Sequence, residues 1–276
     1  MAPFSIIIPA NNEAGYIGPC LQALLDQSDA AGPLQIIVVA NACTDTTVAE
    51  AQAFIPQVEA RGWQMVVLDL AKGGKPNALN TGDKIALGKN RAYLDADILC
   101  DPDLFSALRT TLETDTPRYA TGRLCLRPAR SHVTRAYGRF WQLLPFVQDG
   151  AVGAGMYAVN PAGRARWDTY PDIISDDTFA RLQFGPSERV EVAPAYHWPL
   201  VEGFQQLVKV RRRQDAGVQE LAQHFPDLSA NEGKSPLTLS GLIWRAVRAP
   251  VGFVVYVAVA LVVRSARDTG NWARGR

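Results

Sequence analysis

The chain has 276 residues, and 47% of them are hydrophobic, so it can bury a core as one large α/β domain or two small ones and is not a disordered protein. Its 28 basic and 27 acidic residues nearly cancel, and we expect no nucleic-acid partner. The four cysteines lie far apart, without a Cys-x-x-Cys pair or a histidine cluster, which argues against a zinc site or a disulfide framework and is typical of a reducing cytosol. Residues 1–5 contain no basic segment and no cleavable apolar segment, so we expect no secretory signal.

Four continuous apolar runs, rich in β-branched residues, recur in residues 1–100 with helix-like segments between them. Continuous hydrophobicity, in place of alternation, indicates strands that are covered on both faces, as in a parallel sheet packed between helices. We therefore predict a doubly wound, Rossmann-like, mostly parallel α/β sheet with flanking helices. The four runs are 4–8, 34–39, 65–68 and 92–94.

Polar, loop-forming residues follow each of these runs. Ligands of such sheets bind beyond the carboxyl ends of the strands, so four polar strand ends predict one composite nucleotide site. The four polar segments are Pro9–Glu13, Ala40–Asp45, Lys72–Lys75 and Asp95–Asp97.

Asp95 and Asp97 stand one residue apart after the fourth run. Residues i and i+2 of an extended chain point to the same side, so both carboxylates can face one ligand. Mg²⁺ and Mn²⁺ are suitable ligands, because such ions bind through one or two carboxylates together with substrate phosphates. The structural alternative is a turn or a helix cap, where aspartate is also common.

The elements expected after Asp97 are less regular. Proline is favoured in the first turn of a helix, and Pro102 would begin one. The expected elements are a helix over 101–114, a strand over 120–127, an amphipathic helix over 135–144, a glycine-rich segment over 150–155, an apolar run over 156–159 and a helix beginning at 176–182.

The polar segments, in their order and spacing, resemble the motifs of the family-two glycosyltransferases of the GT-A fold, over about residues 4–215. The resemblance implies an inverting glycosyltransferase that takes a sugar from a nucleotide diphosphate sugar and passes it to an acceptor hydroxyl, with Mg²⁺ or Mn²⁺ as cofactor. Ser5–Glu13 is similar to the family's opening strand and its Pro-x-x-Asn-Glu turn, and residues 37–47 are similar to its second-strand motif. Lys72–Gly82 resembles the family's Gly-Lys-x-x-Ala-Leu-Asn-x-Gly segment, and Asp95–Asp97 resembles its metal-binding Asp-x-Asp.

The resemblance also implies which residues bind the donor and the metal. The nucleotide would contact Pro9, Ala10, Asn12, Glu13, Asn41, Lys75, Asp95 and Arg213. The metal would be held by Asp97, Asp95 and His197. For His197, a packed residue or one that lines the acceptor site is the alternative to ligation.

The catalytic step needs a base, because the acceptor hydroxyl must lose its proton as it attacks the anomeric carbon, and a positioned carboxylate can accept that proton. Asp176 and Asp177 stand in place of the family's Glu-Asp motif, whose second acid is the base, so the resemblance implies that Asp177 has this role. The structural alternative is a helix N-terminus capped by Ser175, where acids interact favourably with the helix dipole. The two roles are compatible.

Two positions depart from the family's pattern. Ala40 stands where many members have an acid that contacts the base, and the amide of Asn41 could supply hydrogen bonds in its place. The family's Gln-x-x-Arg-Trp motif, which accompanies processive polysaccharide synthases, falls on Val210, Arg213 and Gln214. Only the arginine is kept, which favours non-processive transfer of a single sugar.

The tail over residues 241–276 contains six arginines and one aspartate, a net charge of +5. Within it, 249–263 is an uncharged hydrophobic stretch between Arg248 and Arg264, expected to be a helix, and it is shorter than the roughly 20 residues that span a bilayer. Basic flanks are typical of a helix that lies in an anionic membrane surface. The alternatives are a buried helix that closes the core and an oligomer contact. We expect a cytoplasmic enzyme at the cytoplasmic face of a membrane, with a saccharide or a lipid-linked molecule as acceptor.

These inferences predict a catalytic domain over 1–225, with a nucleotide-binding half at 1–100 and an acceptor half at 101–225, then a linker over 226–240 and a membrane-associating tail over 241–276. A sugar nucleotidyltransferase is one alternative, but it should have a glycine-rich, arginine-containing loop where Pro9–Glu13 stands. A catalytically degenerate, nucleotide-sugar-binding membrane scaffold is the other, and Ala40 and the incomplete motif around Arg213 favour it.

Overall fold

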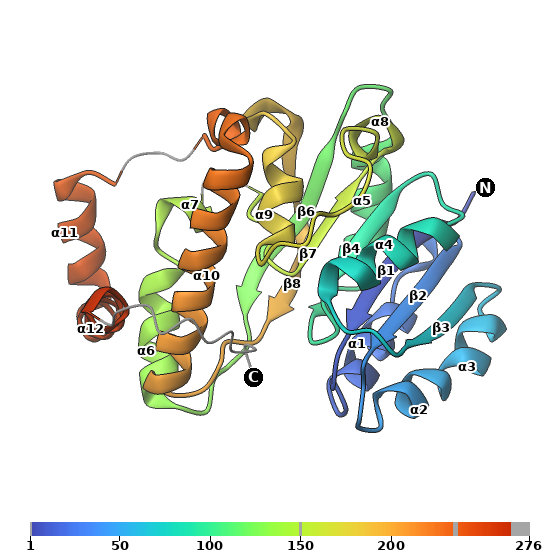
Figure 1. The fold of residues 1–276 in the computed structure, drawn as a ribbon, viewed down its shortest axis with the longest axis horizontal. Coiled ribbons are helices and arrows are strands. Elements are labelled where there is room, and N and C mark those ends of the chain that lie inside the picture. The colour runs from blue at the N-terminus through green and yellow to red at the C-terminus, as the bar shows by residue number, and fades with distance from the viewer. Residues whose placement is uncertain (1, 149–150, 234–236, 266–276) are drawn as a thin grey trace. The chain divides into compact units, whose positions relative to one another are not determined.

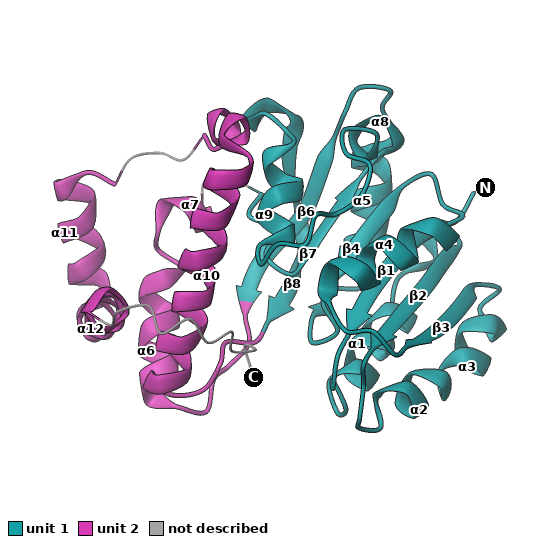
Figure 2. Ribbon diagram, in the orientation of Figure 1, with its two compact units in different colours: residues 1–125, 151–198 teal, residues 126–150, 199–276 magenta. Residues whose placement is uncertain are grey.

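The computed structural model describes residues 2–148, 151–233 and 237–265, and the chain divides into two compact units (Figures 1 and 2). Unit 1 comprises residues 1–125 and 151–198, and unit 2 comprises residues 126–150 and 199–276. This division by packing differs from the predicted division into a catalytic domain, a linker and a tail, which stays a prediction.

Unit 1 is built on a sheet of eight strands, counted over the described residues, in the order β3-β2-β1-β4-β7-β6-β8-β5. β3, β2, β1 and β4 are parallel neighbours, whereas β7 is antiparallel to both β4 and β6, and β8 is antiparallel to β5. The predicted α/β fold is therefore confirmed, with a sheet of mixed direction. The strands are β1 Phe4–Ala10, β2 Leu34–Asn41, β3 Gln64–Leu70, β4 Arg91–Leu94, β5 Leu99–Cys100, β6 Tyr119–Leu126, β7 Met156–Val159 and β8 Arg189–Trp198.

The core of unit 1 lies along β1 and β2, in which every residue is buried. Helix α4 packs closely against this core because Gly82 has no side chain: a Cβ there would lie 2.5 Å from Cγ2 of Ile7. The helices of unit 1 are α1 Ile17–Leu25, α2 Thr47–Gln52, α3 Ile55–Ala60, α4 Lys75–Ile85, α5 Leu104–Leu112, α8 Pro161–Arg164 and α9 Asp176–Leu182, with 3₁₀ turns η1 Asp29–Ala31 and η2 Pro186–Glu188.

The helix predicted over 101–114 begins later, at Leu104. Asp101 is tied to β8 instead: its backbone N–H donates to the carbonyl of Ala195 at 2.9 Å, and its carboxylate accepts the N–H of Ala195 at 2.9 Å. Residues before Leu104 therefore form a turn, and Pro102 lies outside the helix. The strand predicted over 120–127 is confirmed as β6, one residue earlier.

Unit 2 consists of helices. The helix predicted over 135–144 is α6, which begins earlier, at His132, because the side chain of Ser131 caps it and Glu202 accepts the backbone N–H groups of Arg130 and Ser131 at 2.7 and 2.8 Å. The helices are α6 His132–Trp141, α7 Pro145–Gln148, α10 Phe204–His224, α11 Leu239–Arg248 and α12 Pro250–Ser265, with a 3₁₀ segment η3 Pro226–Asn231 in the predicted linker.

The predicted hydrophobic helix is α12, and one side of it packs within unit 2. A Cβ on Gly252 would lie 2.3 Å from the carbonyl oxygen of Ala136, so only glycine allows this approach to α6. The ring of Tyr256 lies 5.1 Å from that of Phe140. Among the described residues no single helix has the length and apolar content to cross a bilayer. Only α11 and α12 taken together have that length and apolar content, and this pair is bent by 119°. Residues 266–276 of the predicted tail lie outside the described residues.

Candidate active site

The turns that follow β1 and β2 are bonded to each other. Asn12 has a positive φ of 56°, and its side-chain oxygen accepts the backbone N–H of Thr44 at 2.8 Å. Glu13 donates its backbone N–H to the hydroxyl of Thr47 at 2.7 Å. Loss of hydration acts to raise the pKa of the Asp45 carboxyl, but the hydrogen bonds that it accepts from Thr47 and Ala14 together outweigh this effect and lower the pKa. The turns after β1 and β2 are therefore tied together beyond the strand ends, and the composite nucleotide site stays a prediction.

Asn41 joins three segments at this edge. Its amide nitrogen donates to the carbonyl of Ala10 at 2.8 Å, and its amide oxygen accepts the N–H of Gly74 at 3.0 Å. The side chain is buried, so both amide atoms are used to hold the ends of β1 and β2 and the start of α4 together. The prediction that Asn41 contacts a nucleotide base stays a prediction, and the contacts seen here are structural.

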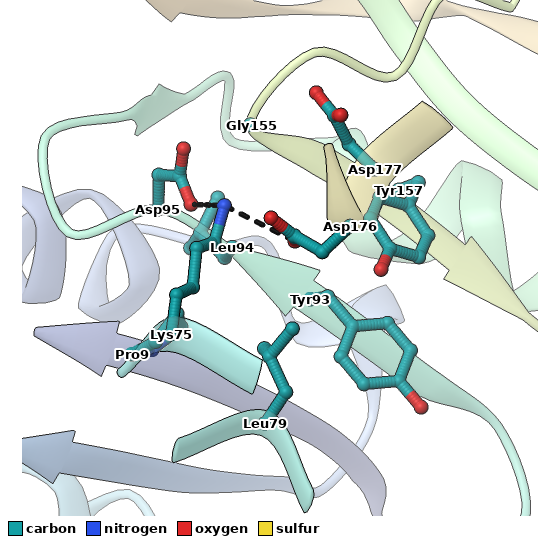
Figure 3. A pocket seen from close by; sticks show the side chains of 10 residues that line it. All are labelled: Pro9, Lys75, Leu79, Tyr93, Leu94, Asp95, Gly155, Tyr157, Asp176 and Asp177. Atoms are coloured by element: carbon teal, nitrogen blue, oxygen red, sulfur yellow. Dashed lines mark ion pairs between the residues drawn. The ribbon is translucent and has the colours of Figure 1, made fainter. Parts of the chain in front are cut away.

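Lys75 begins α4 and lies between two carboxylates (Figure 3). Its ammonium is 2.8 Å from Oδ1 of Asp95 and 3.2 Å from Oδ2 of Asp176. Burial acts to lower the pKa of Lys75, but the nearby carboxylates of Asp176 and Asp95 outweigh it and raise the pKa well above its usual value. The ammonium is therefore charged at any physiological pH.

The loop after β4 carries Asp95 and Asp97. The backbone N–H of Asp95 donates to the carbonyl of Gly155 at 2.8 Å, which joins this loop to the segment before β7. Gly155 has a φ of +71°, and a Cβ there would lie 3.1 Å from Oδ2 of Asp95. Asp97 is buried, whereas the side chain of Asp95 is 34% exposed.

These two aspartates fit a hard divalent cation by the chemistry of their donors, because carboxylate oxygens are what Mg²⁺ and Mn²⁺ prefer. Over the described ranges, no group of three or more His, Cys, Asp and Glu side chains is arranged to hold a metal. The fit is thus to an ion that takes its remaining ligands from phosphate oxygens and water.

Asp176 and Asp177 form the first turn of α9. Asp176 is buried, and burial, partly offset by Lys75, raises its pKa to about 6. Asp177 lines the same pocket, accepts the N–H of Thr178 at 2.6 Å, and in Figure 3 its carboxylate points away from the pair of Lys75 and Asp176. The expected cap is not formed, because the side chain of Ser175 makes no capping hydrogen bond.

The pocket that contains these groups lies in unit 1. It is lined by the end of β1, the first two turns of α4, the end of β4, the start of β7 and the start of α9. The lining residues are Pro9, Lys75, Leu79, Tyr93, Leu94, Asp95, Gly155, Tyr157, Asp176 and Asp177.

The sequence did not indicate the two tyrosines that line the pocket, Tyr93 and Tyr157, or Tyr170, which contacts both. The rings of Tyr93 and Tyr157 stack at 5.0 Å, and the hydroxyls of Tyr157 and Tyr170 are 2.9 Å apart. Burial raises the pKa of each phenol, so all three stay neutral. The alternation of side chains along a strand could have indicated them. Tyr93 is two residues from Asp95 and Tyr157 is two residues from Gly155, so each should point to the same side as a residue that lines the pocket.

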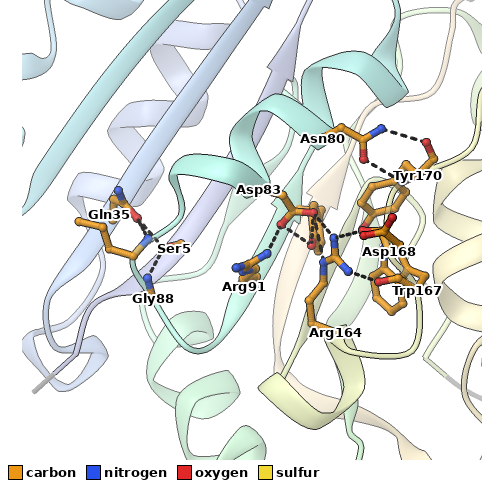
Figure 4. A network of polar contacts seen from close by, with 12 residues as sticks. Ser5, Gln35, Asn80, Asp83, Gly88, Arg91, Arg164, Trp167, Asp168 and Tyr170 are labelled. Atoms are coloured by element: carbon orange, nitrogen blue, oxygen red, sulfur yellow. Dashed lines mark hydrogen bonds and ion pairs between the residues drawn. The ribbon is translucent and has the colours of Figure 1, made fainter.

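A second network holds α4 in place (Figure 4). Asp83 is ion-paired with Arg91 and Arg164, each at 2.8 Å. Asn80 bonds the backbone of Tyr170 through both amide atoms, at 2.9 and 2.7 Å. Within α4, Lys75 therefore lies at the pocket, whereas Asn80 and Asp83 hold the helix and the chain that leads to α9 in place.

Several predicted residues are not among those that line the pocket: Ala10, Asn12, Glu13, Asn41, Asp97, His197 and Arg213. His197, on β8, bonds Asp101 through Nε2 at 2.8 Å, and its predicted role as a metal ligand is untested. Arg213 lies on α10 and so belongs to unit 2, and its predicted contact with the diphosphate also stays a prediction.

The family model described as glycosyl transferase family 2 matches residues 5–160 of this chain. The uncharacterized glycosyltransferase YibD of Escherichia coli K12 is 30% identical over 144 residues. The aligned part is 51% of this chain but 38% of that protein, so the chain corresponds to well under half of this relative.

Solved structures share the fold at low sequence identity. The mannosyltransferase PcManGT from Pyrobaculum calidifontis, in complex with GDP-Man and Mn²⁺, has a TM-score of 0.62 at 19% identity, with 97% of this chain and 76% of that chain covered. Glucosyl-3-phosphoglycerate synthase from Mycobacterium tuberculosis, in complex with Mn²⁺ and UDP-glucose, has a TM-score of 0.55 at 16% identity, with 80% and 78% covered. TarS from S. aureus, in complex with UDP-GlcNAc, has a TM-score of 0.53 at 14% identity, with 95% and 91% covered.

Proposed function

The chain belongs to glycosyl transferase family 2, and on that premise we propose that it transfers a sugar from a nucleoside diphosphate sugar to an acceptor hydroxyl, with inversion at the anomeric carbon. The observation that carries this proposal is the meeting of one lysine and three aspartates in a single pocket at the carboxyl end of β1 and β4. Such a pocket has a cation for the departing diphosphate and a carboxylate for the proton of the acceptor.

The donor side of the proposed site is formed by Lys75 and the loop of Asp95 and Asp97. Asp97 and Asp95 would hold a divalent cation, and His197 could become a third ligand only by leaving Asp101, which its Nε2 contacts at 2.8 Å in this structure. When bound, this cation would stabilise the negative charge that develops on the diphosphate. PcManGT and glucosyl-3-phosphoglycerate synthase were both solved with Mn²⁺ and a nucleotide sugar, which supports this choice of cofactor. The proposed nucleotide contacts are Pro9, Ala10, Asn12, Glu13, Asn41, Lys75, Asp95 and Arg213.

The acceptor side is assigned to Asp177, which accepts the proton of the attacking hydroxyl. Asp176 has a different role in this proposal: it is buried and bonded to Lys75, so it positions that lysine. A hydroxyl that attacks directly, on the face opposite the departing diphosphate, inverts the anomeric centre.

The test is a transfer or slow-hydrolysis assay with a panel of nucleoside diphosphate sugars and Mn²⁺. Asp177→Asn should abolish turnover and leave binding of the nucleoside diphosphate unchanged, whereas Asp172→Asn, an exposed aspartate shortly before α9, should retain activity. An active Asp177→Asn variant would refute the assignment of the base. Nucleotide binding without any turnover in the wild-type chain would support the scaffold, and release of pyrophosphate from a nucleoside triphosphate and a sugar phosphate would support the nucleotidyltransferase.

The proposal includes an anionic membrane surface as the place of reaction, reached through α11 and the outward side of α12. No residue of α11 is buried, and its apolar side chains are exposed: Leu239 74%, Ile243 57%, Trp244 50% and Val247 75%. Residues 237–265 contain three arginines and no acid, and the guanidinium of Arg248 lies 4.7 Å from the ring of Trp244. An apolar face beside arginines favours a helix that lies in the interface of an anionic bilayer. A lipid-linked acceptor would be met there.

Flotation of the full chain with vesicles of anionic phospholipid tests this surface. Val247→Glu should lower the bound fraction by about tenfold, because a carboxylate on the inserted face opposes both burial and the lipid charge. Val218→Glu is the matched control, since Val218 is an exposed valine of unit 2 on α10 and is 51% exposed. Equal flotation of both variants and the wild-type chain would contradict the proposal.

A further inference from the structure

The ammonium of Lys75 lies between carboxylates from two separate elements. Asp95 belongs to the loop after β4, Asp176 to the first turn of α9, and Lys75 to the start of α4, and the two ion pairs measure 2.8 and 3.2 Å. The side chain of Asp176 is 5% exposed, whereas those of Lys75 and Asp95 are about equally accessible, at 31% and 34%. The lysine thus pairs with one buried carboxylate and one partly exposed carboxylate (Figure 3).

The charges of the pocket are unbalanced. Its lining includes three aspartates and Lys75 as the one basic residue, so the lining is net negative when these groups are ionised. A nucleoside diphosphate is also negative, and it would be repelled unless a further cation entered with it. Lys75 can neutralise only one of these three carboxylates.

Asp95 has competing uses in this arrangement. Its Oδ1 is bonded to Lys75, and its Oδ2 lies against Gly155, where a Cβ would be only 3.1 Å away. A metal ion that approached Asp95 would meet the ammonium of Lys75, and two cations on one carboxylate repel each other.

We propose that Lys75 is the resting counter-ion of Asp95 and gives up this place to the metal when the donor arrives. Asp95 exchanges the ammonium for the metal, and Lys75, still held by Asp176, pairs with the diphosphate. This inference rests on the proposed function, since it concerns the donor and its cation. It implies that the metal alone binds weakly and that metal and diphosphate strengthen each other's binding.

Binding of Mn²⁺ tests this exchange without any turnover. The free ion is followed by electron paramagnetic resonance during titration of the full chain, first alone and then with UDP or GDP. Lys75→Met removes the competing cation, so its affinity for Mn²⁺ alone should rise by about tenfold, and the gain in Mn²⁺ affinity on adding the nucleotide should shrink by a similar factor. Lys75→Arg keeps the charge and should behave as the wild-type chain does. Lys72→Met removes an exposed lysine three residues earlier and controls for loss of charge near the site.

The outcomes separate this inference from the proposed function. If the wild-type chain binds Mn²⁺ with UDP or GDP, but Lys75→Met has the same or a lower affinity for Mn²⁺ alone, the exchange is refuted and the proposed function stands. The exchange is also refuted if Lys72→Met raises the affinity as much as Lys75→Met does. If the wild-type chain binds neither Mn²⁺ nor a nucleoside diphosphate, both proposals fail.

Discussion

Asp83 is the buried centre of the network that fixes α4, the helix that begins with Lys75 (Figure 4). Its carboxylate accepts from Arg91 and Arg164, each at 2.8 Å, and from the hydroxyl of Tyr93 at 2.9 Å. Asp83→Asn keeps the shape but offers one acceptor oxygen, so an amide NH₂ would face a guanidinium that is itself largely buried. Loss of one partner of a buried ion pair costs about 3–5 kcal/mol, and we expect the free energy of unfolding to fall by about 3 kcal/mol because Arg164 keeps backbone acceptors.

Urea unfolding followed by circular dichroism measures this loss, and Asp29 supplies the matched control. Asp29 also pairs with an arginine, Arg61, at 2.7 Å, but its side chain is fully exposed at 101%. Asp29→Asn should therefore leave the midpoint of unfolding unchanged. If the two substitutions have equal effects, burial is not what makes the Asp83 network strong, and the reasoning is refuted.

Three further outcomes are expected. Gly82→Ala should lower the free energy of unfolding, measured in urea, by about 1–2 kcal/mol. A Cβ there would lie 2.5 Å from Ile7, and the cost of this overpacking exceeds the stability that alanine adds as a better helix former. Gly18→Ala is the control and should not lower the free energy of unfolding, because the nearest contact of its Cβ would be at 3.8 Å. Burial raises the pKa of Asp176 to about 6, so the native state holds this proton more tightly than the unfolded chain does, and the group's contribution to stability falls as pH rises from about 4 to about 6. The wild-type free energy of unfolding minus that of Asp176→Asn should thus be larger at about pH 4.5 than at about pH 7, and a constant difference would contradict this. Removal of divalent ions with EDTA should stop transfer and added Mn²⁺ should restore it; full activity in EDTA would argue against the metal role of Asp95 and Asp97.

The strand ends could be predicted because their signals are local. A continuous apolar run such as 34–39 shows a strand covered on both faces, and the polar residues after it mark the edge where a ligand binds. The boundaries that differed depended on distant partners: Asp101 is held by Ala195, and Glu202 accepts the N–H groups of the two residues that precede α6. Such partners are not visible in a local pattern.

The tail shows a similar limit. Hydrophobicity and flanking arginines predicted a helix over 249–263, and α12 is that helix. The pattern did not reveal that Gly252 and Tyr256 pack one side of it within unit 2, or that α11 has the more exposed apolar residues. A uniformly apolar helix carries little information about which side will be covered.

By itself, the sequence determined the succession of strands and polar turns along residues 1–100, the Asp95 and Asp97 pair and the family, because hydrophobic periodicity and short motifs are properties of neighbouring residues. Only the tertiary structure decided that Lys75 meets both Asp95 and Asp176, and that Asp176 and Asp177 line one pocket with Asp176 buried against Lys75. It also decided that the side-chain amide of Asn41 bonds the backbone of Ala10 and Gly74. These contacts join residues far apart in the chain, and they follow from the order and register of β1, β4 and β7 and from the burial of α9, which no local pattern specifies.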